Sequence, residues 1–320
     1  MSLLSRINTR PGGCCERFLM PTTFPDAYRL DKKRLAAAFN RAAPSYDRHA
    51  VLQQTVAMRM LERLALVKIT PRRVLDAGAG TGYAAALLRR TYRPEALVAF
   101  DIAHGMLRLA RRHAPRFLSR QVYICGDVER LPLAAESIDL AFSNLSLQWC
   151  NDLDRALEEF RRVLNTQGIL MFSTFGPDTL SELRLSWAKV DKRIHVHGFA
   201  DMHDIGDALI RAGFSSPVLD VERFTMTYRD AYALMRDLKT IGAVNAAQGR
   251  HRGLTGKGEL TALVNEYERF RCHGVLPATF EVVYGHAWVP EAGVRAQDGS
   301  TVAAFPIEEL RSAIKMRLPR

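Results

Sequence analysis

Three glycines at alternate positions follow a carboxylate in the stretch Asp76-Ala77-Gly78-Ala79-Gly80-Thr81-Gly82. The apolar residues before Asp76 predict a buried strand, and the run that begins at Tyr83 predicts a helix. A glycine turn between a strand and a helix N-terminus lets a ligand approach the backbone and presents free N–H groups to it. The stretch therefore predicts a nucleotide site whose loop consists of Gly78, Ala79, Gly80 and Gly82.

The acid at position 76 decides which nucleotide this loop suits. Loops that bind a dinucleotide pyrophosphate typically show G-x-G-x-x-G, whereas the pattern here is D-x-G-x-G-x-G. A carboxylate at the strand end would repel a pyrophosphate, but it would attract a ligand with an ammonium and a sulfonium group. S-adenosylmethionine carries both groups, and we predict it as the cofactor.

Polar residues also end the next predicted strands. Asp101 lies roughly 20 residues after the glycine turn, where an acid accepts both ribose hydroxyls, or it caps a helix near Met106. Asp127 would accept from the adenine amino group while Val128 packs on the ring, unless it only shapes a Gly-Asp turn. Asn144 would lie beside the methyl donor, or it caps a helix.

Three further residues complete the predicted cofactor set. Tyr46 would close over the cofactor from an N-terminal helix, with a plain core aromatic as the alternative, and Ile102 and Met106 follow Asp101. Acids at three successive strand ends match the class I methyltransferase arrangement. Methyl transfer is an in-line displacement that mainly needs alignment, and it needs a base only if the acceptor holds a proton. The sequence has no cluster of metal ligands, so no metal is expected.

The elements that position these residues alternate between short buried strands and helices, which predicts a doubly wound, Rossmann-like α/β sheet. Strands are expected at residues 73–76, 97–101, 122–125, 138–143 and 169–175, with helices at 83–90, 106–113, 153–164 and 178–190. Two lid helices, 31–43 and 46–66, the second capped by Ser45, would precede the sheet. The predicted organisation is an arm (1–30), a methyltransferase domain (31–290) and a tail (291–320). Within that domain we expect the lid (31–70), the core (71–228), a helical insertion (229–278) and a last strand (279–290).

Composition limits the partners and the compartment. The formal net charge of +11 favours an acidic partner, whether nucleic acid, an anionic membrane or an acidic protein. The five cysteines are scattered without a C-x-x-C pair, which indicates a reducing compartment. No apolar run approaches a membrane span or a secretory signal, so we expect a cytoplasmic protein. The arginine-bearing N-terminus weakly resembles an organelle transit peptide and fits an unstructured bacterial extension equally well.

Several blocks outside the cofactor motifs are more specific. They are residues 39–47 (FNRAAPSYD), 143–149 (SNLSLQW), 175–183 (FGPDTLSEL), 195–199 (HVHGF), 201–209 (DMHDIGDAL), 238–245 (LKTIGAVN), 276–279 (LPAT) and 284–288 (YGHAW). With these blocks the chain resembles the malonyl-acyl-carrier-protein O-methyltransferases of biotin synthesis. The resemblance implies methylation of the free carboxylate of a malonyl thioester, carried by acyl carrier protein or coenzyme A.

A carboxylate is already ionised at pH 7, so it needs no general base but does need donors that hold it against the methyl group. Candidates for this clamp are Arg193, His195, His197, Gln148 and Trp149, each of which has an alternative as a solvated loop charge or a satisfied core group. Acyl carrier proteins are acidic, so among the partner classes the resemblance selects a carrier protein, and neither nucleic acid nor membrane is expected. The basic residues assigned to that partner are Lys32, Lys33, Arg34, Arg250 and Arg252.

Two competing hypotheses remain at this point. The segment from Asp178 to Arg184 also resembles a mitochondrial complex I assembly factor of the same fold, which implies arginine hydroxylation. A non-catalytic basic scaffold with a vestigial cofactor cleft is the other, although the acids at 76, 101 and 127 count against it.

Overall fold

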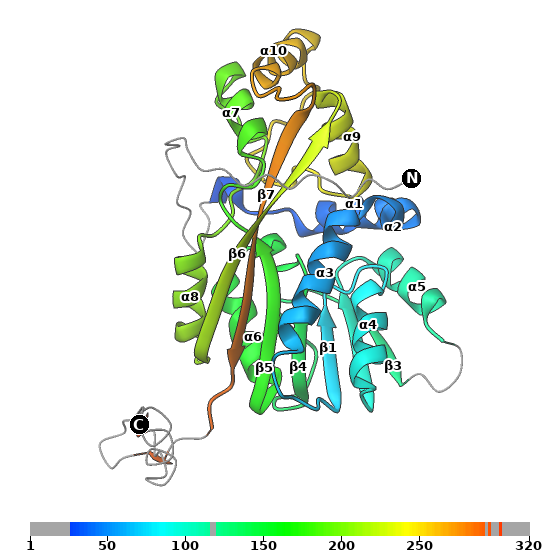
Figure 1. Cartoon of the computed structure of the whole chain (residues 1–320), viewed down its shortest axis with the longest axis vertical. Coiled ribbons are helices and arrows are strands. Elements are labelled where there is room, and N and C mark those ends of the chain that lie inside the picture. Colours follow the sequence, from blue (N-terminus) through cyan, green and yellow to red (C-terminus); the bar gives the residue numbers. More distant parts are fainter. Residues whose placement is uncertain (1–25, 116–119, 292–293, 296–300, 303–320) are drawn as a thin grey trace, which may run out of the picture.

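The computed structural model describes residues 26–115, 120–291, 294–295 and 301–302, with a central sheet flanked by helices (Figure 1). The sheet holds seven strands in the order β3-β2-β1-β4-β5-β7-β6. Their bounds are β1 Arg73–Ala77, β2 Ala96–Asp101, β3 Gln121–Cys125, β4 Ile138–Ser143, β5 Leu164–Phe175, β6 Ser215–Tyr228 and β7 Leu276–Trp288. A separate pair, β8 Val294–Arg295 and β9 Thr301–Val302, lies in the predicted tail.

Strand direction and order place the ligand edge of this sheet. β1 to β5 are parallel, whereas β7 runs antiparallel to both β5 and β6. The chain order reverses between β1 and β4, and doubly wound sheets bind ligands beyond the carboxyl ends of the strands at such a point. Central strands such as residues 138–143 are almost wholly buried, because helices cover both faces. The predicted Rossmann-like α/β sheet is confirmed.

Helices cover the two faces of the sheet as separate cores. α3 (Val51–Leu64) and α4 (Tyr83–Tyr92) bury their apolar sides on one face, and Figure 1 shows them in front of the sheet. α6 (Leu153–Val163) and α8 (Met202–Arg211) cover the other face. α5 (His104–His113) packs beside β2 and β3. The amphipathic spacing of Leu153, Leu157 and Phe160 explains why α6 buries a single side.

The N-terminal helices differ from the prediction in two respects. α1 (Lys32–Ala42) begins at the N-cap Asp31, which accepts from Arg34 N at 3.0 Å. The second predicted helix is interrupted at Ala50, leaving α2 (Tyr46–His49) and α3. Ser45 does not cap it; its hydroxyl donates to Ala42 O at 3.3 Å, so the backbone continues in a helical turn from α1. Figure 1 shows α1 and α2 lying across the upper ends of the strands.

A second group of helices lies above that edge. β6 and β7 extend beyond the rest of the sheet, and α9 (Ala231–Thr240) and α10 (Lys257–Glu268) connect them, with α10 packed against α7 (Ser181–Val190) (Figure 1). α7 starts at Ser181 rather than at residue 178, because Leu180 has a left-handed φ of 55°. The last strand of the sheet, β7, starts at Leu276, inside the range predicted for the insertion. It is longer than predicted because its pairing with β6 continues as far as Leu276 opposite Tyr228.

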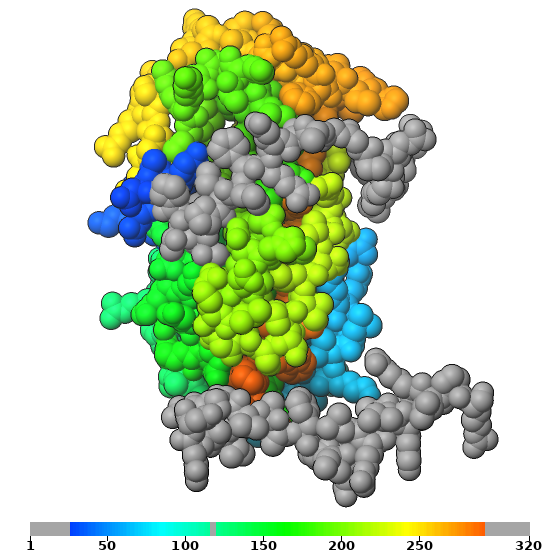
Figure 2. Space-filling model, turned by 90° about the vertical axis from the view of Figure 1, so that its left-hand side faces the viewer, coloured from blue at the N-terminus to red at the C-terminus, as the bar shows by residue number. Residues whose placement is uncertain are grey.

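Residues 26–30 do not behave as the predicted arm. Leu30 is 4% exposed and bridges to Ala247 of the insertion. Figure 2 shows the blue N-terminal residues directly beneath the yellow residues of the insertion. Residues 1–25 and most of the predicted tail (292–293, 296–300 and 303–320) lie outside the described residues.

Candidate active site

The glycine loop between β1 and α4 follows a backbone path that favours glycine. Gly78, Gly80 and Gly82 have φ values of 80°, 54° and 88°. A Cβ on Gly78 would lie 2.4 Å from the Cβ of Ser146, and one on Gly82 would lie 3.0 Å from the Cβ of Ala110. The loop is therefore wedged between the segment after β4 and helix α5.

The N–H groups of this loop bond to the protein itself. Gly78 N and Ala79 N donate to Phe100 O at 2.7 and 2.9 Å. Gly80 N donates to Asp101 Oδ2 at 2.9 Å, and Gly82 N donates to Ala79 O at 2.9 Å. The prediction that free loop N–H groups face the ligand is therefore wrong for these four residues. Since these donors already have acceptors, the loop has little to offer an anion such as a pyrophosphate.

Asp76 shows which charge the cleft does suit. It is 1% exposed, and neither carboxylate oxygen has a hydrogen-bond partner within the described residues. Burial, with a smaller contribution from Asp101, raises the pKa of Asp76 to about 7. An orphaned buried acceptor is costly unless a ligand satisfies it, so the cleft favours a ligand that brings a cation or donors.

Asp101 and Asp127 end the neighbouring strands. Asp101 Oδ1 accepts from Ala103 N at 2.7 Å, and burial raises its pKa to about 6. It is not the N-cap of α5, because that position is Ala103. Asp127 Oδ1 accepts from Lys32 Nζ at 3.0 Å, so Lys32 faces the cleft rather than a carrier protein, contrary to prediction. Most of the predicted cofactor residues line the cleft, namely Tyr46, Gly78, Gly80, Asp101, Ile102, Met106, Asp127, Val128 and Asn144, whereas Asp76, Ala79 and Gly82 do not.

Asn144 and Tyr46 connect the lid to this cleft. Asn144 Nδ2 donates to Gln53 O of α3 at 2.9 Å, and its Oδ1 accepts from Ser173 Oγ at 3.0 Å. Asn144 is thus held by the lid and the sheet and is no helix cap. Tyr46 lines the cleft and also the larger pocket beside it.

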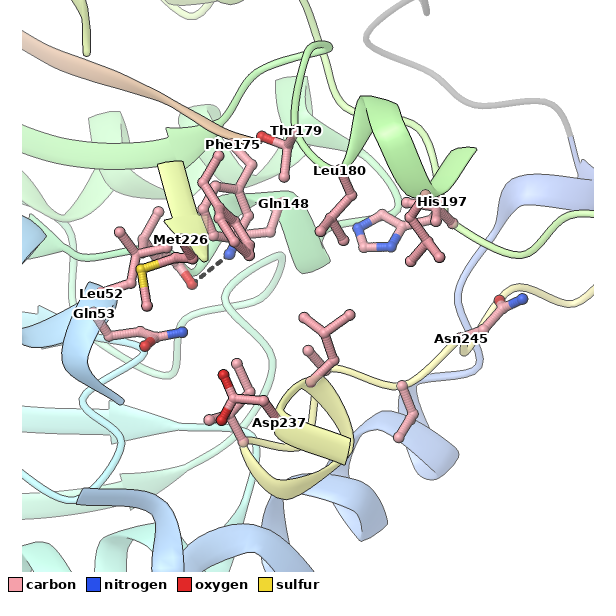
Figure 3. Close-up of a pocket in the computed structure, with 18 of the residues that line it drawn as sticks. Leu52, Gln53, Gln148, Phe175, Thr179, Leu180, His197, Met226, Asp237 and Asn245 are labelled. Atoms are coloured by element: carbon pink, nitrogen blue, oxygen red, sulfur yellow. Dashed lines mark hydrogen bonds between the residues drawn. The ribbon is translucent and has the colours of Figure 1, made fainter. Parts of the chain in front are cut away.

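That larger pocket lies beyond the cleft. Figure 3 shows side chains from α3, β6 and the insertion around one cavity. Most of the wall is apolar, with Leu52, Phe175, Leu180, Met226 and Phe280 among its residues. Phe39, Tyr46, Leu145 and Trp149 line both the pocket and the cleft. A methyl donor in the cleft would therefore face an acceptor in the pocket across these four side chains.

Comparisons with known proteins agree with this geometry. A family model described as a methyltransferase domain matches residues 75–172, which include all three strand-end acids. The malonyl-[acyl-carrier protein] O-methyltransferase of Methylovorus sp. is 54% identical over 88% of this chain and 96% of its own. The protein of that name from Gallionella capsiferriformans is 50% identical over 85% and 96%. The chain belongs to this O-methyltransferase family.

The fold of this methyltransferase agrees with solved structures. The BH2331 protein of Bacillus halodurans aligns with a TM-score of 0.54 at 17% identity, over 74% of this chain and all (100%) of that one. The YcgJ protein of Bacillus subtilis aligns with a TM-score of 0.54 at 13% identity, over 73% and 99%. These likenesses show the class I methyltransferase fold, and the family resemblance found in the sequence is confirmed.

His197 is a polar residue of this methyltransferase that lines the pocket. Its Nε2 atom is buried without a hydrogen-bond partner among the described residues, and Figure 3 shows the imidazole directed into the cavity. The ring packs between Trp149 at 5.0 Å and Phe199 at 4.6 Å. Burial, and then the positive charge of Arg184, lowers the pKa of His197 to about 4, against the opposing effect of a hydrogen bond with the Gln148 backbone. The imidazole is therefore neutral at pH 7.

The other predicted clamp residues lie differently. His195 also lines the pocket, stacked on Trp187 at 3.6 Å with Nε2 2.9 Å from Asp191 Oδ1. Arg193 does not line it; its guanidinium pairs with Glu259 at 3.1 Å. His195 and His197 thus occupy the pocket side of this loop, and Arg193 points away from the pocket.

Gln148 and Trp149, the last two predicted clamp residues, have different structural roles. Gln148 is buried, its Nε2 donates to Leu145 O at 2.7 Å, and its Oε1 accepts from Thr174 Oγ1 at 3.4 Å. Its amide therefore holds the loop after β4 in place. Trp149 forms part of the shared wall and contacts Phe39 edge-on at 5.5 Å.

Sequence reasoning missed several residues around the pocket. Met226 and Tyr228 line it, and Tyr228 donates a hydrogen bond of 2.8 Å to Asp237 of α9. Their alternation along β6 was the available signal, since every second residue of a strand shares one face. Arg184 was missed too; its guanidinium donates to Pro177 O and Thr179 O at 2.9 and 3.0 Å, which braces the loop before α7.

The described residues offer neither a metal site nor a helix that could span a membrane. No group of three or more His, Cys, Asp or Glu side chains there could hold a metal ion. None of the helices there is long and apolar enough to cross a membrane.

Proposed function

We propose that this enzyme uses S-adenosylmethionine to methylate the free carboxylate of a malonyl group carried by acyl carrier protein. The observation that carries the proposal is the wall that the cofactor cleft and the apolar pocket share at Tyr46 and Trp149. The printed names of relatives about half identical to this chain support the substrate. Nothing favours arginine hydroxylation or a vestigial cleft.

The cleft residues fit this cofactor. When bound, it supplies an electrophilic methyl group. Asp76, whose oxygens are buried without partners, would accept from its ammonium group. Asp101 would accept from the ribose hydroxyls, and Asp127 from the adenine amino group, while Val128 and Met106 supply apolar contacts. The loop donors are already used within the protein, which suits a cationic ligand better than a pyrophosphate.

The acceptor side requires alignment and no base. A carboxylate with a pKa near 4 is ionised at pH 7. We assign His197 as the main donor to it, with His195 beside it, because both line the pocket and Arg193 does not. A neutral imidazole has one N–H, and the Gln148 backbone already engages it, so Nε2 would donate to the carboxylate when the ring is protonated. A negative ligand favours that protonated form.

The carrier protein would dock where the pocket opens beside the insertion. Ala243, Val244 and Asn245 line the pocket, and the same loop continues to Arg250 and Arg252. Burial, and then the nearby positive charges of Arg34 and Arg252, lowers the pKa of Arg250, so these guanidinium groups form one like-charged cluster. Such a cluster is stabilised by an acidic partner, which acyl carrier proteins provide.

The decisive experiment is a product analysis. Purified protein is incubated with malonyl-carrier protein and methyl-labelled S-adenosylmethionine, and the intact product is weighed by mass spectrometry. We expect one added methyl group that is released by mild ester hydrolysis. Acetyl-carrier protein, which lacks the free carboxylate, is the matched control and should gain nothing. Methylation of the acetyl form, or of the carrier polypeptide, would contradict the proposal.

A further inference from the structure

Lys32, the first residue of α1, reaches from the lid into the adenine side of the cleft. Its Nζ lies 3.0 Å from Asp127 Oδ1 and 2.6 Å from Glu129 Oε1, and its side chain is 21% exposed. Burial lowers its pKa, but the acidic groups around it, Cys150, Glu129 and Asp127, outweigh burial and raise the pKa above its ordinary value. The ammonium group is therefore charged at pH 7.

This ammonium group fixes which oxygen of Asp127 a ligand meets. Oδ1 accepts from Lys32 Nζ and also from the backbone N of Glu129 at 3.2 Å. Among the described residues Oδ2 has no partner, and Asp127 lines the cleft. A carboxylate that is held at one oxygen by two donors presents its other oxygen in a defined direction.

The rest of the segment holds Lys32 in this position. Glu129 Oε1 also accepts from Asn151 N at 2.6 Å, and the Asn151 side chain bonds to Leu30 N and O at 2.6 and 3.1 Å. On the other side, Asp31 N donates to Ala246 O at 2.8 Å. The backbone on either side of the lysine is thus anchored to both the core and the insertion.

We propose that Lys32 is a positioning residue for the cofactor: it turns Asp127 so that Oδ2 meets the adenine amino group. Without this cation, Asp127 and Glu129 would be two neighbouring carboxylates that repel each other, and Asp127 would lose its orientation. The inference rests on the cofactor named in the proposed function. It adds a lid residue that acts through the acid and touches the cofactor only indirectly.

The test compares two ligands that differ at the amino group alone. S-adenosylhomocysteine carries that amino group, and its 6-deamino purine analogue has a hydrogen atom in its place. Isothermal titration should show that Lys32→Met weakens S-adenosylhomocysteine binding about tenfold, the value of one charge-assisted hydrogen bond. Binding of the 6-deamino analogue should change less than about twofold, since it has no amino group to donate to Asp127.

Lys33→Met is the matched control, because it removes the same charge from the exposed neighbour on the same helix. It should leave both ligands unaffected, and Lys32→Arg should recover part of the lost affinity. Equal weakening of both ligands by Lys32→Met would overturn the proposal and reduce Lys32 to a general support of the lid. An unchanged affinity would overturn it as well. If the wild-type protein binds neither ligand, the cofactor assignment itself fails.

Discussion

The cofactor cleft and the substrate pocket meet at Tyr46, yet the chain builds them in different ways. The cleft lies at the ends of consecutive strands. Of the buried acids at these ends, Asp76 has no hydrogen-bond partner among the described residues, and Asp101 accepts from the loop N–H of Gly80. The pocket is assembled from α3, β6, the loop before α7 and the insertion, and most of its wall is apolar. The cleft therefore recognises charge and hydrogen-bonding groups, whereas the pocket excludes water and offers few donors. Substitutions in the two regions should separate cofactor affinity from turnover.

The largest effect is expected in the pocket. His197→Ala should lower kcat/KM for malonyl-carrier protein about 100-fold, because the carboxylate loses its donor and its alignment, roughly 2–3 kcal/mol. The dissociation constant of S-adenosylhomocysteine should stay within about twofold, since His197 lines only the pocket. Steady-state kinetics and titration calorimetry on one preparation give both values. His203→Ala, on an 81% exposed side chain of α8, is the control and should behave as wild type. An unaffected kcat/KM in the His197 variant would remove this residue from the clamp.

The converse effect is expected in the cleft. Asp101→Ala should weaken cofactor binding about 30-fold, or about 2 kcal/mol, because the ribose hydroxyls lose a charged acceptor and Gly80 N loses its partner. At saturating cofactor, kcat should fall far less than in the His197 variant. Asp101→Asn keeps one acceptor oxygen and should give an intermediate dissociation constant. If calorimetry finds the alanine variant equal to wild type, Asp101 only stabilises the loop.

The buried acids also predict how the cleft responds to pH. Burial holds the pKa of Asp76 at about 7 and that of Asp101 at about 6, above the ordinary value near 4. A cation and hydroxyl donors favour the ionised carboxylates, so binding should release protons below pH 7, and affinity should fall about tenfold from pH 7.5 to 5.5. Calorimetry in two buffers of different ionisation enthalpy counts those protons. A dissociation constant that is flat over this interval would contradict the assignment.

The same raised pKa values predict how the stability of the ligand-free protein changes with pH. Both acids ionise near pH 4 in the unfolded chain but only near pH 6 to 7 in the fold. The folded state therefore binds more protons in this window, and the contribution of these groups to stability falls as the pH rises from 4 to 7. Thermal melts of Asp76→Asn should lose part of that slope.

A smaller effect is expected in the loop that follows the pocket-lining residues 243–245. The double variant Arg250→Glu/Arg252→Glu should slow association with malonyl-carrier protein about fivefold at low salt, and raised salt should narrow the difference. Stopped-flow rates measure this. Arg111→Glu/Arg112→Glu on α5 is the matched control, with the same charge change on exposed side chains elsewhere. Equal slowing of association in both double variants would mean that only the net charge of the protein matters. A wild-type association rate that does not depend on salt would exclude electrostatic steering of the carrier protein.

The smallest effect is expected at Arg193. Its guanidinium pairs with Glu259 outside the pocket, and a partly exposed pair of this kind contributes about 0–1 kcal/mol to stability. Arg193→Ala should keep kcat/KM within about twofold of wild type, measured beside His197→Ala. A large loss would show that the loop rearranges and brings Arg193 to the substrate.

The sequence alone determined the cleft, because its residues are local in the chain and repeat one arrangement. A glycine turn after a strand, and an acid at the end of the next strand, must converge once the strands are parallel neighbours. Pattern therefore identified Asp76, Asp101 and Asp127 and the sheet that carries them. The pattern did not show that the loop N–H groups bond to Phe100 O and Asp101, since those bonds depend on how the loop packs against the end of β2.

Tertiary structure decided the pocket. Arg193, His195 and His197 lie at alternate positions, so their spacing does not tell them apart. Only the packing of the two imidazoles against Trp187 and Trp149 shows that His195 and His197 face the cavity. Lys32 gave the same sequence signal as Lys33, a basic residue at a helix start, yet one reaches Asp127 and the other is exposed. Contacts between residues 95 positions apart follow from the way the lid crosses the sheet, and short-range periodicity carries no information about that crossing.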